Sequence, residues 1–294
     1  MSDPARSVPA MRSMTDLAVR PGFSVSSVTC RDDHTGWSSA EMAGGHRVVL
    51  IRRGRFRRRA AGCVAELDAT VGYLALPGDE EHFSHPAGGD VCTSVNLTRE
   101  HWAVLAGDEM RLRRRSVYVD AALALAHRRL LAAATTGETG PVLSEQLLGL
   151  VGRVLTQAAA GPVTAAAAGQ RVSPGDQVVV ARARAAVIDG DPAADGLFTL
   201  ADLLAVSPYR LSRAFSREMG VSLTRYRNRV RVGLALDRLA QGERSLGVLA
   251  ADLGFADQAH LSRTVREHLG QTPVALRRLL APDPVVGGSG RSLR

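Results

Sequence analysis

The hydrophobic residues from Val25 to about Leu97 occur in short runs that turn-forming residues interrupt. The runs His46–Ile51, Val71–Leu76 and Asp90–Leu97 are short, contain β-branched side chains and predict strands. The glycine-containing stretch Arg52–Arg55 predicts a hairpin turn after the first of these runs. Several short strands at this spacing favour a β-sandwich or a small barrel.

Two later stretches place leucine and alanine at three- and four-residue intervals, the spacing of one face of a helix. They run from Asp120 to about Ala134 and from Val142 to about Ala159, with Gly140-Pro141 between them. Apolar stripes of this kind must be covered. They can pack onto the chain's own barrel or form a dimer interface, and the pattern leaves both readings open.

The segments without a clear period divide the chain. Residues 1–20 predict a flexible arm, residues 161–176 a linker with many breakers, and residues 282–294 a disordered tail rich in Pro, Gly and Ser. Two domains remain, one with strands over residues 21–160 and one with helices over residues 177–281.

The C-terminal third contains a weak copy of itself at an offset of about fifty residues. A single tripeptide match arises by chance, but several aligned positions indicate two copies of one structural unit. The matching positions are Leu211-Ser212-Arg213 with Leu261-Ser262-Arg263, Gly220 with Gly270, Ser222 with Thr272, and Arg227 with Arg277.

The second copy predicts two helices across a short turn. Ser245 can cap a helix over Leu246–Leu253, Gly254 supplies the turn, and Asp257 can cap a second helix that ends at Gly270. This arrangement is the DNA-binding helix-turn-helix.

The first copy follows the same plan. Leu200, Leu203 and Leu204 mark its leading helix, and Ser207-Pro208 starts a second helix that runs to about Met219. A long helix from Leu223 to about Leu239 then separates the two copies. Two such units can enter successive major grooves if their second helices lie about 34 Å apart.

The total charge says little about function, but the positions of the arginines along the sequence bear on DNA binding. The net charge is +8 and all 37 basic residues are arginine, which is partly a codon bias of GC-rich bacterial genomes. Between Arg210 and Arg231 seven arginines face a single acid, Glu218. A charge run is usually a solvated face, but beside a duplicated helix-turn-helix it favours contacts with phosphates.

Three segments of this third are Ser207–Phe215, Leu249–Arg263 and Gly270-Gln271-Thr272-Pro273. Together they resemble the AraC/XylS family of bacterial regulators, over roughly residues 178–281. The resemblance implies DNA binding through the exposed face of each recognition helix. That face is Tyr209, Ser212 and Arg213 in the first unit, and Gln258, His260 and Arg263 in the second, with Ser262 in the same set.

The chemistry of these side chains fits base recognition. Arginine can bind guanine, and glutamine can bind adenine, through two hydrogen bonds. Arg210, Arg217 and Arg266 are the expected phosphate contacts. Two of these residues have an alternative role. His260 can be a packing residue, and Ser212 can contact a phosphate.

Two positions depart from the family pattern. The stretch from Leu200 to Ser207 is about three residues shorter than usual, which predicts a strained or weaker first unit. Val265 stands where the family usually has phenylalanine, which predicts a smaller core contact.

The N-terminal domain resembles the family's cupin-like barrel through Tyr73–Pro77, His82–Pro86 and Gly89–Thr93. The resemblance implies a domain for sensing and dimerisation that holds a small effector, and no residue identifies that effector. The expected fold class is α+β, with a cupin-like β-barrel and helical pair followed by an all-α domain of two helix-turn-helix units.

Three rival functions follow from the same residues. A metal enzyme would use His46, Glu81, His82, His85 and Cys92 as ligands, but no clear ligand pattern is present. A regulator that repairs DNA by accepting alkyl groups needs clustered metal-bound cysteines, and the three here are isolated. A barrel that only dimerises stays open.

The sequence therefore predicts a transcriptional regulator with no catalytic residues, cofactor or metal. Its expected partners are double-stranded DNA, a second copy of the chain, RNA polymerase and a small-molecule effector. An apolar leader, a membrane span and paired cysteines are all lacking, so we expect a cytoplasmic protein.

Overall fold

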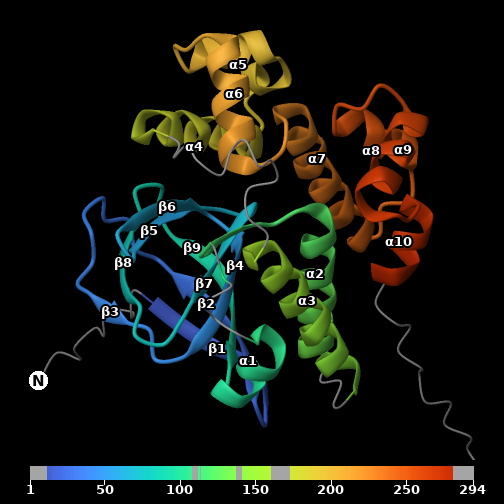
Figure 1. Ribbon diagram of the computed structural model, residues 1–294. Helices are drawn as coiled ribbons and strands as arrows, with labels where there is room; N and C mark the ends of the chain where they lie inside the picture. Colours follow the sequence, from blue (N-terminus) through green and yellow to red (C-terminus); the bar gives the residue numbers. More distant parts are fainter. Residues whose placement is uncertain (1–11, 108–111, 113, 137–140, 160–172, 281–294) are drawn as a thin grey trace, which may run out of the picture. The chain divides into compact units, whose positions relative to one another are not determined.

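The structure is a computed structural model that describes residues 12–107, 112, 114–136, 141–159 and 173–280. The chain divides into two compact units, residues 1–227 and 228–294, and the boundary falls inside one helix. The first unit begins with strands and continues into helices, and the second consists of helices in its described part (Figure 1).

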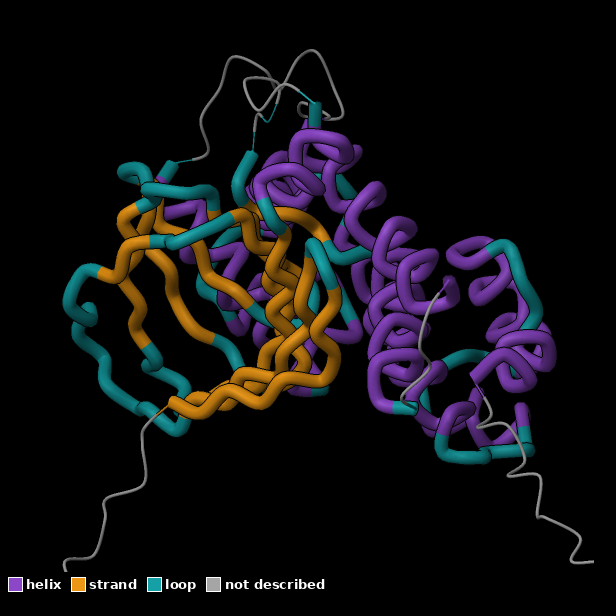
Figure 2. Tube along the Cα trace, turned by 90° about the horizontal axis from the view of Figure 1, so that it is seen from below, coloured by secondary structure: helices purple, strands orange, loops and turns teal. Residues whose placement is uncertain are grey.

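Two antiparallel sheets build the N-terminal domain. The larger has the order β1 (Arg12–Arg20), β2 (Phe23–Cys30), β9 (Asp90–Leu97), β4 (His46–Arg53), β7 (Val71–Ala75) and β10 (Ser116–Tyr118). The smaller has the order β3 (Glu41–Met42), β8 (Glu80–Ser84), β5 (Phe56–Ala60) and β6 (Cys63–Leu67). Figure 2 shows the strands of the two sheets gathered together.

The three predicted strands are confirmed as β4, β7 and β9, but the predicted hairpin turn is wrong. Arg52 and Arg53 still belong to β4, and Gly54-Arg55 joins it to β5, a strand of the other sheet that does not pair with β4. The hairpin is the next connection, where Ala60 pairs with Cys63 and Ala61 takes a positive φ of 48°.

The predicted arm is also wrong over its second half, because residues 12–20 form β1 and pair along their length with β2. β1 lies at the edge of its sheet, and Ala18 is its one buried residue. A strand with so little burial has no alternation of apolar and polar residues to reveal it. Residues 1–11 lie outside the described residues.

Three helices complete the N-terminal core. Trp102 of α1 (Arg99–Ala106), Leu123 of α2 (Ala121–Thr135) and Leu150 of α3 (Pro141–Ala159) join one hydrophobic cluster with the larger sheet. Asp120, the first residue of the predicted helical stretch, is the N-cap of α2. The helical pair thus packs onto its own barrel, and its use in a dimer stays a prediction.

The remaining helices are α4 (Pro174–Asp189), α5 (Leu197–Leu203), α6 (Pro208–Met219), α7 (Leu223–Ala240), α8 (Leu246–Asp252), α9 (Gln258–Leu269) and α10 (Pro273–Leu280), with a 3-10 turn at Pro192–Asp195. The predicted linker extends too far, because Ser173 caps α4 and Pro174 begins it. Residues 160–172 and the predicted tail lie outside the described residues. Among the helices described, none has the length and apolar content to cross a membrane.

A buried network of polar groups connects α4 and the start of α7 to the barrel. Arg184 of α4 donates to the carboxylate of Asp68 and, at 3.1 Å, to the carbonyl of Glu66. The other oxygen of Asp68 accepts from the hydroxyl of Thr70 at 2.6 Å, and that hydroxyl lies 2.9 Å from the hydroxyl of Tyr226 in α7. Because these groups are buried, the contact fixes their geometry.

Candidate DNA-binding surface

The first helix-turn-helix is formed by α5 and α6. The two helices are in contact, and Leu200 of α5 and Leu211 and Phe215 of α6 are fully buried. Ser207 caps α6 by accepting from the backbone N–H of Arg210, and Gly220 ends the helix at φ 72°. The local signals therefore leave one side of α6 in the core and the other exposed.

The exposed side of α6 carries three of the predicted base-reading residues. Tyr209, Ser212 and Arg213 are all exposed. The guanidinium of Arg213 donates to the hydroxyl of Tyr209 at 2.8 Å and lies 5.7 Å from the centre of its ring. Tyr209 therefore orients Arg213, which reduces the entropy that Arg213 loses on binding.

The two predicted phosphate contacts in this unit differ from each other. Arg210 is exposed and donates to Asp176 of α4 at 2.8 Å, and this bond holds the pKa of Asp176 below its usual range. An exposed pair of this kind is weak, so Arg210 can exchange Asp176 for a phosphate. Arg217 is half-buried and faces a cavity next to the barrel.

The second helix-turn-helix is formed by α8 and α9. Leu249 of α8 and Leu261 of α9 are fully buried, and Val265 is 1% exposed, so valine fills its core position. Asp257 caps α9 by accepting from the backbone N–H of His260 at 2.6 Å. Gly254 makes the turn at φ 70°.

The exposed side of α9 carries Gln258, Arg263 and Arg266, with Ser262 half-exposed. The half-buried His260 packs its ring against Phe255, with ring centres 5.3 Å apart, and its Nδ1 accepts from the backbone N–H of Ala256 at 3.3 Å. The packing role that the sequence left open for His260 is therefore present. Its contact with a base stays a prediction.

The two units match closely along the chain. Gly220 and Gly270 both end their recognition helices in the left-handed conformation. Ser222 and Thr272 each accept a backbone N–H three residues later, at the starts of α7 and α10. These pairs confirm the predicted duplication.

The shortening of the first unit relative to the family stays a prediction, but the first unit can be compared with the second. Both α5 and α8 have seven residues. Ala205, at φ 55°, occupies the position of Gly254, and the turn after it has one residue fewer. Ser212 and Arg213 thus correspond to Ser262 and Arg263, whereas Tyr209 corresponds to Ala259.

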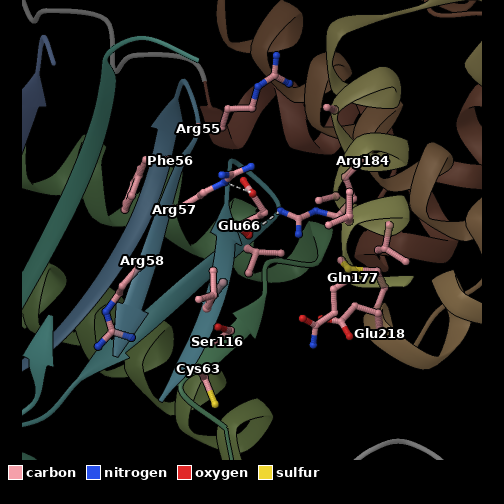
Figure 3. Close-up of a pocket in the computed structure, with 18 of the residues that line it drawn as sticks. Arg55, Phe56, Arg57, Arg58, Cys63, Glu66, Ser116, Gln177, Arg184 and Glu218 are labelled. Atoms are coloured by element: carbon pink, nitrogen blue, oxygen red, sulfur yellow. Dashed lines mark hydrogen bonds and ion pairs between the residues drawn. The ribbon is translucent and has the colours of Figure 1, made fainter. Parts of the chain in front are cut away.

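A large cavity lies between β5 and β6 of the barrel and the helices α4 and α6, with a volume of about 950 Å³. Figure 3 shows Arg57 and Arg58 on the strand side of it, and Gln177, Arg184 and Glu218 on the helix side. Burial raises the pKa of Glu218. Eight arginines and two acids, Glu66 and Glu218, line this cavity. The arginines are Arg55, Arg57, Arg58, Arg114, Arg115, Arg182, Arg184 and Arg217.

The residues that the sequence offered for a metal enzyme do not converge. His46 stacks on Trp102 at 4.7 Å, Glu81 accepts from Arg58 at 2.6 Å, and His82 faces Glu80 at 3.0 Å. Of these five residues, only His85 belongs to a group of three possible metal ligands within the described part of the chain. Its neighbours there come from loops and strand ends without a motif, so sequence reasoning missed them.

The arrangement of α5 with α6, and of α8 with α9, defines a DNA-binding protein of the helix-turn-helix class. Residues 200–279 match a family model described as a helix-turn-helix domain. The domain is of the AraC/XylS type, as its curated relatives indicate.

Three of those relatives illustrate the match. The chain is 30% identical over 93 residues to the bifunctional transcriptional activator/DNA repair enzyme AdaA of Bacillus subtilis, covering 32% of this chain and 44% of AdaA. It is 34% identical to the transcriptional activator RhaS of Pectobacterium carotovorum and 37% identical to the transcriptional regulator RipA of Corynebacterium glutamicum. These two matches cover 27% and 32% of this chain, and 28% of each relative, so the chain spans less than half the length of each of the three.

Solved structures give weaker likenesses. Fatty acid-bound ToxT of Vibrio cholerae is 11% identical with a TM-score of 0.36, over 90% of this chain and 99% of ToxT. The C-terminal domain of AraT, a response regulator of Geobacillus stearothermophilus, is 25% identical with a TM-score of 0.36, over 42% of this chain and 98% of that domain. Both scores are too low to establish the fold, which rests on the strands and helices described above.

Proposed function

We propose that the chain is a sequence-specific transcriptional regulator that reads neighbouring major grooves with α6 and α9. The observation that carries the proposal is the repeated serine–arginine pair, Ser212-Arg213 and Ser262-Arg263, on the outer side of two duplicated recognition helices. The AraC/XylS-type relatives support it, because the names of RhaS and RipA describe transcriptional control. The spacing of the two helices on DNA stays a prediction.

We assign Arg213, Gln258 and Arg263 to base edges, and Arg210 and Arg266 to phosphates. The first three are exposed and can form two hydrogen bonds to one base. Since Tyr209 is replaced by Ala259 in the second unit, the two helices should prefer different base sequences. An operator with two unlike half-sites follows.

The proposed effector site is the large arginine-lined cavity rather than the inside of the barrel. The inner cavity of the barrel is about 160 Å³, below the ~300–1,000 Å³ that small organic ligands usually occupy. The outer cavity, at about 950 Å³, is large enough, and its excess of arginine favours an anionic ligand. A ligand there touches α4 and α6, so it can favour one placement of the first recognition helix.

The proposal includes action in the cytoplasm as an activator without enzymatic activity. It also includes two protein partners, a second copy of the chain and RNA polymerase. The exposed Val142 and Leu148 of α3, at 47% and 49%, are apolar positions available to a second copy. Light scattering on the purified chain measures its mass, and a monomer at all concentrations contradicts the dimer.

The experiment that tests the function selects genomic fragments with the full chain and measures their affinity by fluorescence anisotropy at several salt concentrations. We expect one preferred sequence bound at least a thousandfold (~10³) tighter than random DNA, with affinity falling as salt rises. The double variant Arg213→Ala/Arg263→Ala should lose the preference, and Arg129→Ala, an exposed arginine of α2, should keep it. A preference that survives the double variant contradicts the assignment.

A further inference from the structure

Five side chains with metal-ligating atoms gather at one end of the barrel, around its inner cavity. They are Cys30 at the end of β2, Asp32 and His34 in the loop after it, His85 after β8, and Asp90 at the start of β9. None of them takes part in the proposed DNA contacts.

The pairing of β2 with β9 brings two of these residues together. Cys30 lies directly opposite Asp90, so both side chains point to the same face of the sheet. Cys30 is 9% exposed and Asp90 6%. The thiol of Cys92, two residues after Asp90 in β9, donates to Oδ2 of Asp90 at 2.8 Å.

His85 joins this pair from the next loop. It is 7% exposed, and its ring stacks between Phe56 and His34, with centres 5.4 and 5.5 Å away. Its backbone N–H donates to the carbonyl of His34 at 2.9 Å, which ties the two loops together. The ring is thus held in one orientation.

Two histidines of this cluster form close pairs with carboxylates. Nε2 of His85 lies 3.0 Å from Oδ1 of Asp90, and Nδ1 of His34 lies 2.9 Å from Oδ1 of Asp32. Nδ1 of His85, by contrast, is buried and has no partner of either kind among the described residues. Buried polar atoms rarely stay unsatisfied, so this nitrogen is placed for a further binding partner.

The spacing of the donors suits a metal ion. In the group Cys30, His85 and Asp90, one ligand atom from each residue lies within 4.8 Å of the others, and the same holds for Asp32, His34 and His85. Around a tetrahedral zinc ion the ligand atoms are about 3.3–3.8 Å apart, so small side-chain rotations close the difference.

We propose that Cys30, His85 and Asp90 bind a divalent transition-metal ion of the zinc type inside the barrel. A thiolate, an imidazole and a carboxylate are the ligands that Zn²⁺, Co²⁺ and Fe²⁺ share. These three are more deeply buried than His34 and Asp32, whose side chains are 34% and 19% exposed. The inner cavity of about 160 Å³ accommodates an ion and its remaining small ligand.

This inference goes beyond the proposed function, and its test involves no DNA. The full chain, stripped with a chelator, is titrated with Co²⁺ and followed by visible and near-ultraviolet absorption. We expect one equivalent to bind, with ligand-field bands of a four-coordinate ion and a thiolate-to-cobalt charge-transfer band, and Zn²⁺ to abolish both.

Two variants identify the ligands. Cys30→Ser should remove the charge-transfer band, and His85→Gln should weaken Co²⁺ binding at least tenfold (~10-fold or more). Cys63→Ser is the matched control because Cys63 is exposed on β6, and it should bind like the parent. Far-UV circular dichroism checks folding. If His85→Gln does not fold, Cys30→Ser decides, because serine conserves the shape of the side chain.

The proposal is overturned if the parent binds no Co²⁺. It is equally overturned if the charge-transfer band survives in Cys30→Ser or disappears in Cys63→Ser. Loss of binding in His34→Ala together with full binding in Cys30→Ser assigns the ion to the group of Asp32, His34 and His85, and contradicts Cys30 as a ligand.

Discussion

At the scale of single residues, His127 of α2 makes the barrel sensitive to acid. Its ring is buried, and its Nε2 lies 2.8 Å from the hydroxyl of Thr93 in β9. Burial, followed by the nearby charges of Arg128 and Arg52, lowers the pKa of His127 to about 3. The folded protein therefore keeps this histidine neutral where an unfolded chain protonates it.

This difference sets the direction of a pH effect on stability. An unfolded histidine binds a proton below pH ~6.5, so from there down to about pH 3 the unfolded state holds more protons. The free energy of unfolding should fall with falling pH by up to about 1.4 kcal/mol per unit across this window, and the contribution is complete above it. Urea denaturation of His127→Gln should show a flatter profile. His101→Gln, at an exposed position, is the control and should keep the slope of the parent.

The two classes of arginine should behave differently on DNA. Arg263→Ala should cost about 1–3 kcal/mol on the preferred operator and relax specificity in one half-site, because it removes a base contact. Arg266→Ala should weaken binding to all sequences alike and reduce the salt slope by about one unit, because it removes a phosphate contact. Arg266 is exposed, whereas Arg217 is half-buried. Anisotropy titrations measure both effects, and equal effects of the two variants on specificity contradict the distinction.

At the scale of elements, the duplicated turns provide a matched comparison. Ala205 has a positive φ of 55°, and Gly254 has φ 70° at the corresponding position. Positive φ costs a residue with a Cβ about 1–2 kcal/mol, whereas glycine adopts it freely. Ala205→Gly should therefore raise the free energy of unfolding by about 0.5–1 kcal/mol.

The reverse change, Gly254→Ala, should lower the free energy of unfolding by about 1 kcal/mol. Its Cβ would lie 3.2 Å from the guanidinium of Arg231, the mobile end of a side chain, so crowding adds little. Denaturant titrations of both variants test the pair. Effects of the same sign would show that the backbone conformation does not control stability in these turns.

The elements that the sequence predicted best are those with strong local signals. The caps Ser207 and Asp257 and the terminal glycines Gly220 and Gly270 lie where expected. β1 carries no such signal because it is a largely exposed edge strand. Ser173-Pro174 carries the same signal as Ser207-Pro208, but the small residues before it obscured the start of α4.

The candidate DNA surface was predictable because helix periodicity separates the buried Leu211 and Leu261 from the exposed Arg213 and Arg263. The metal-ligating cluster was not. Its members Cys30, His85 and Asp90 come from different strands and loops, and only the register of β2 with β9 brings them together.

At the scale of the whole molecule, the ion pair of Arg184 and Asp68 connects α4 to the barrel, and substituting it tests how much this contact stabilises the protein. The two residues are 116 positions apart and are 5% and 6% exposed. Burial lowers the pKa of Arg184, but Asp68 and then Tyr226 more than offset this and raise it. Asp68→Ala leaves a buried guanidinium without its carboxylate, which should cost about 3–5 kcal/mol of unfolding free energy.

A double-mutant cycle measures the coupling. Asp68→Ala together with Arg184→Met should cost less than the sum of the two single changes, because the pair removes both charges at once. Additive costs would mean that the two residues stabilise the protein independently.

The same buried pair limits how this chain can be recombined with its relatives. A gene fusion that joins this barrel to another regulator's helical half keeps Asp68 but replaces Arg184 with whatever residue the donor carries. Unless that residue is also cationic, the hybrid buries the carboxylate of Asp68 without a positive partner. A stable hybrid must therefore take α4 and the turn between β6 and β7 from the same parent protein.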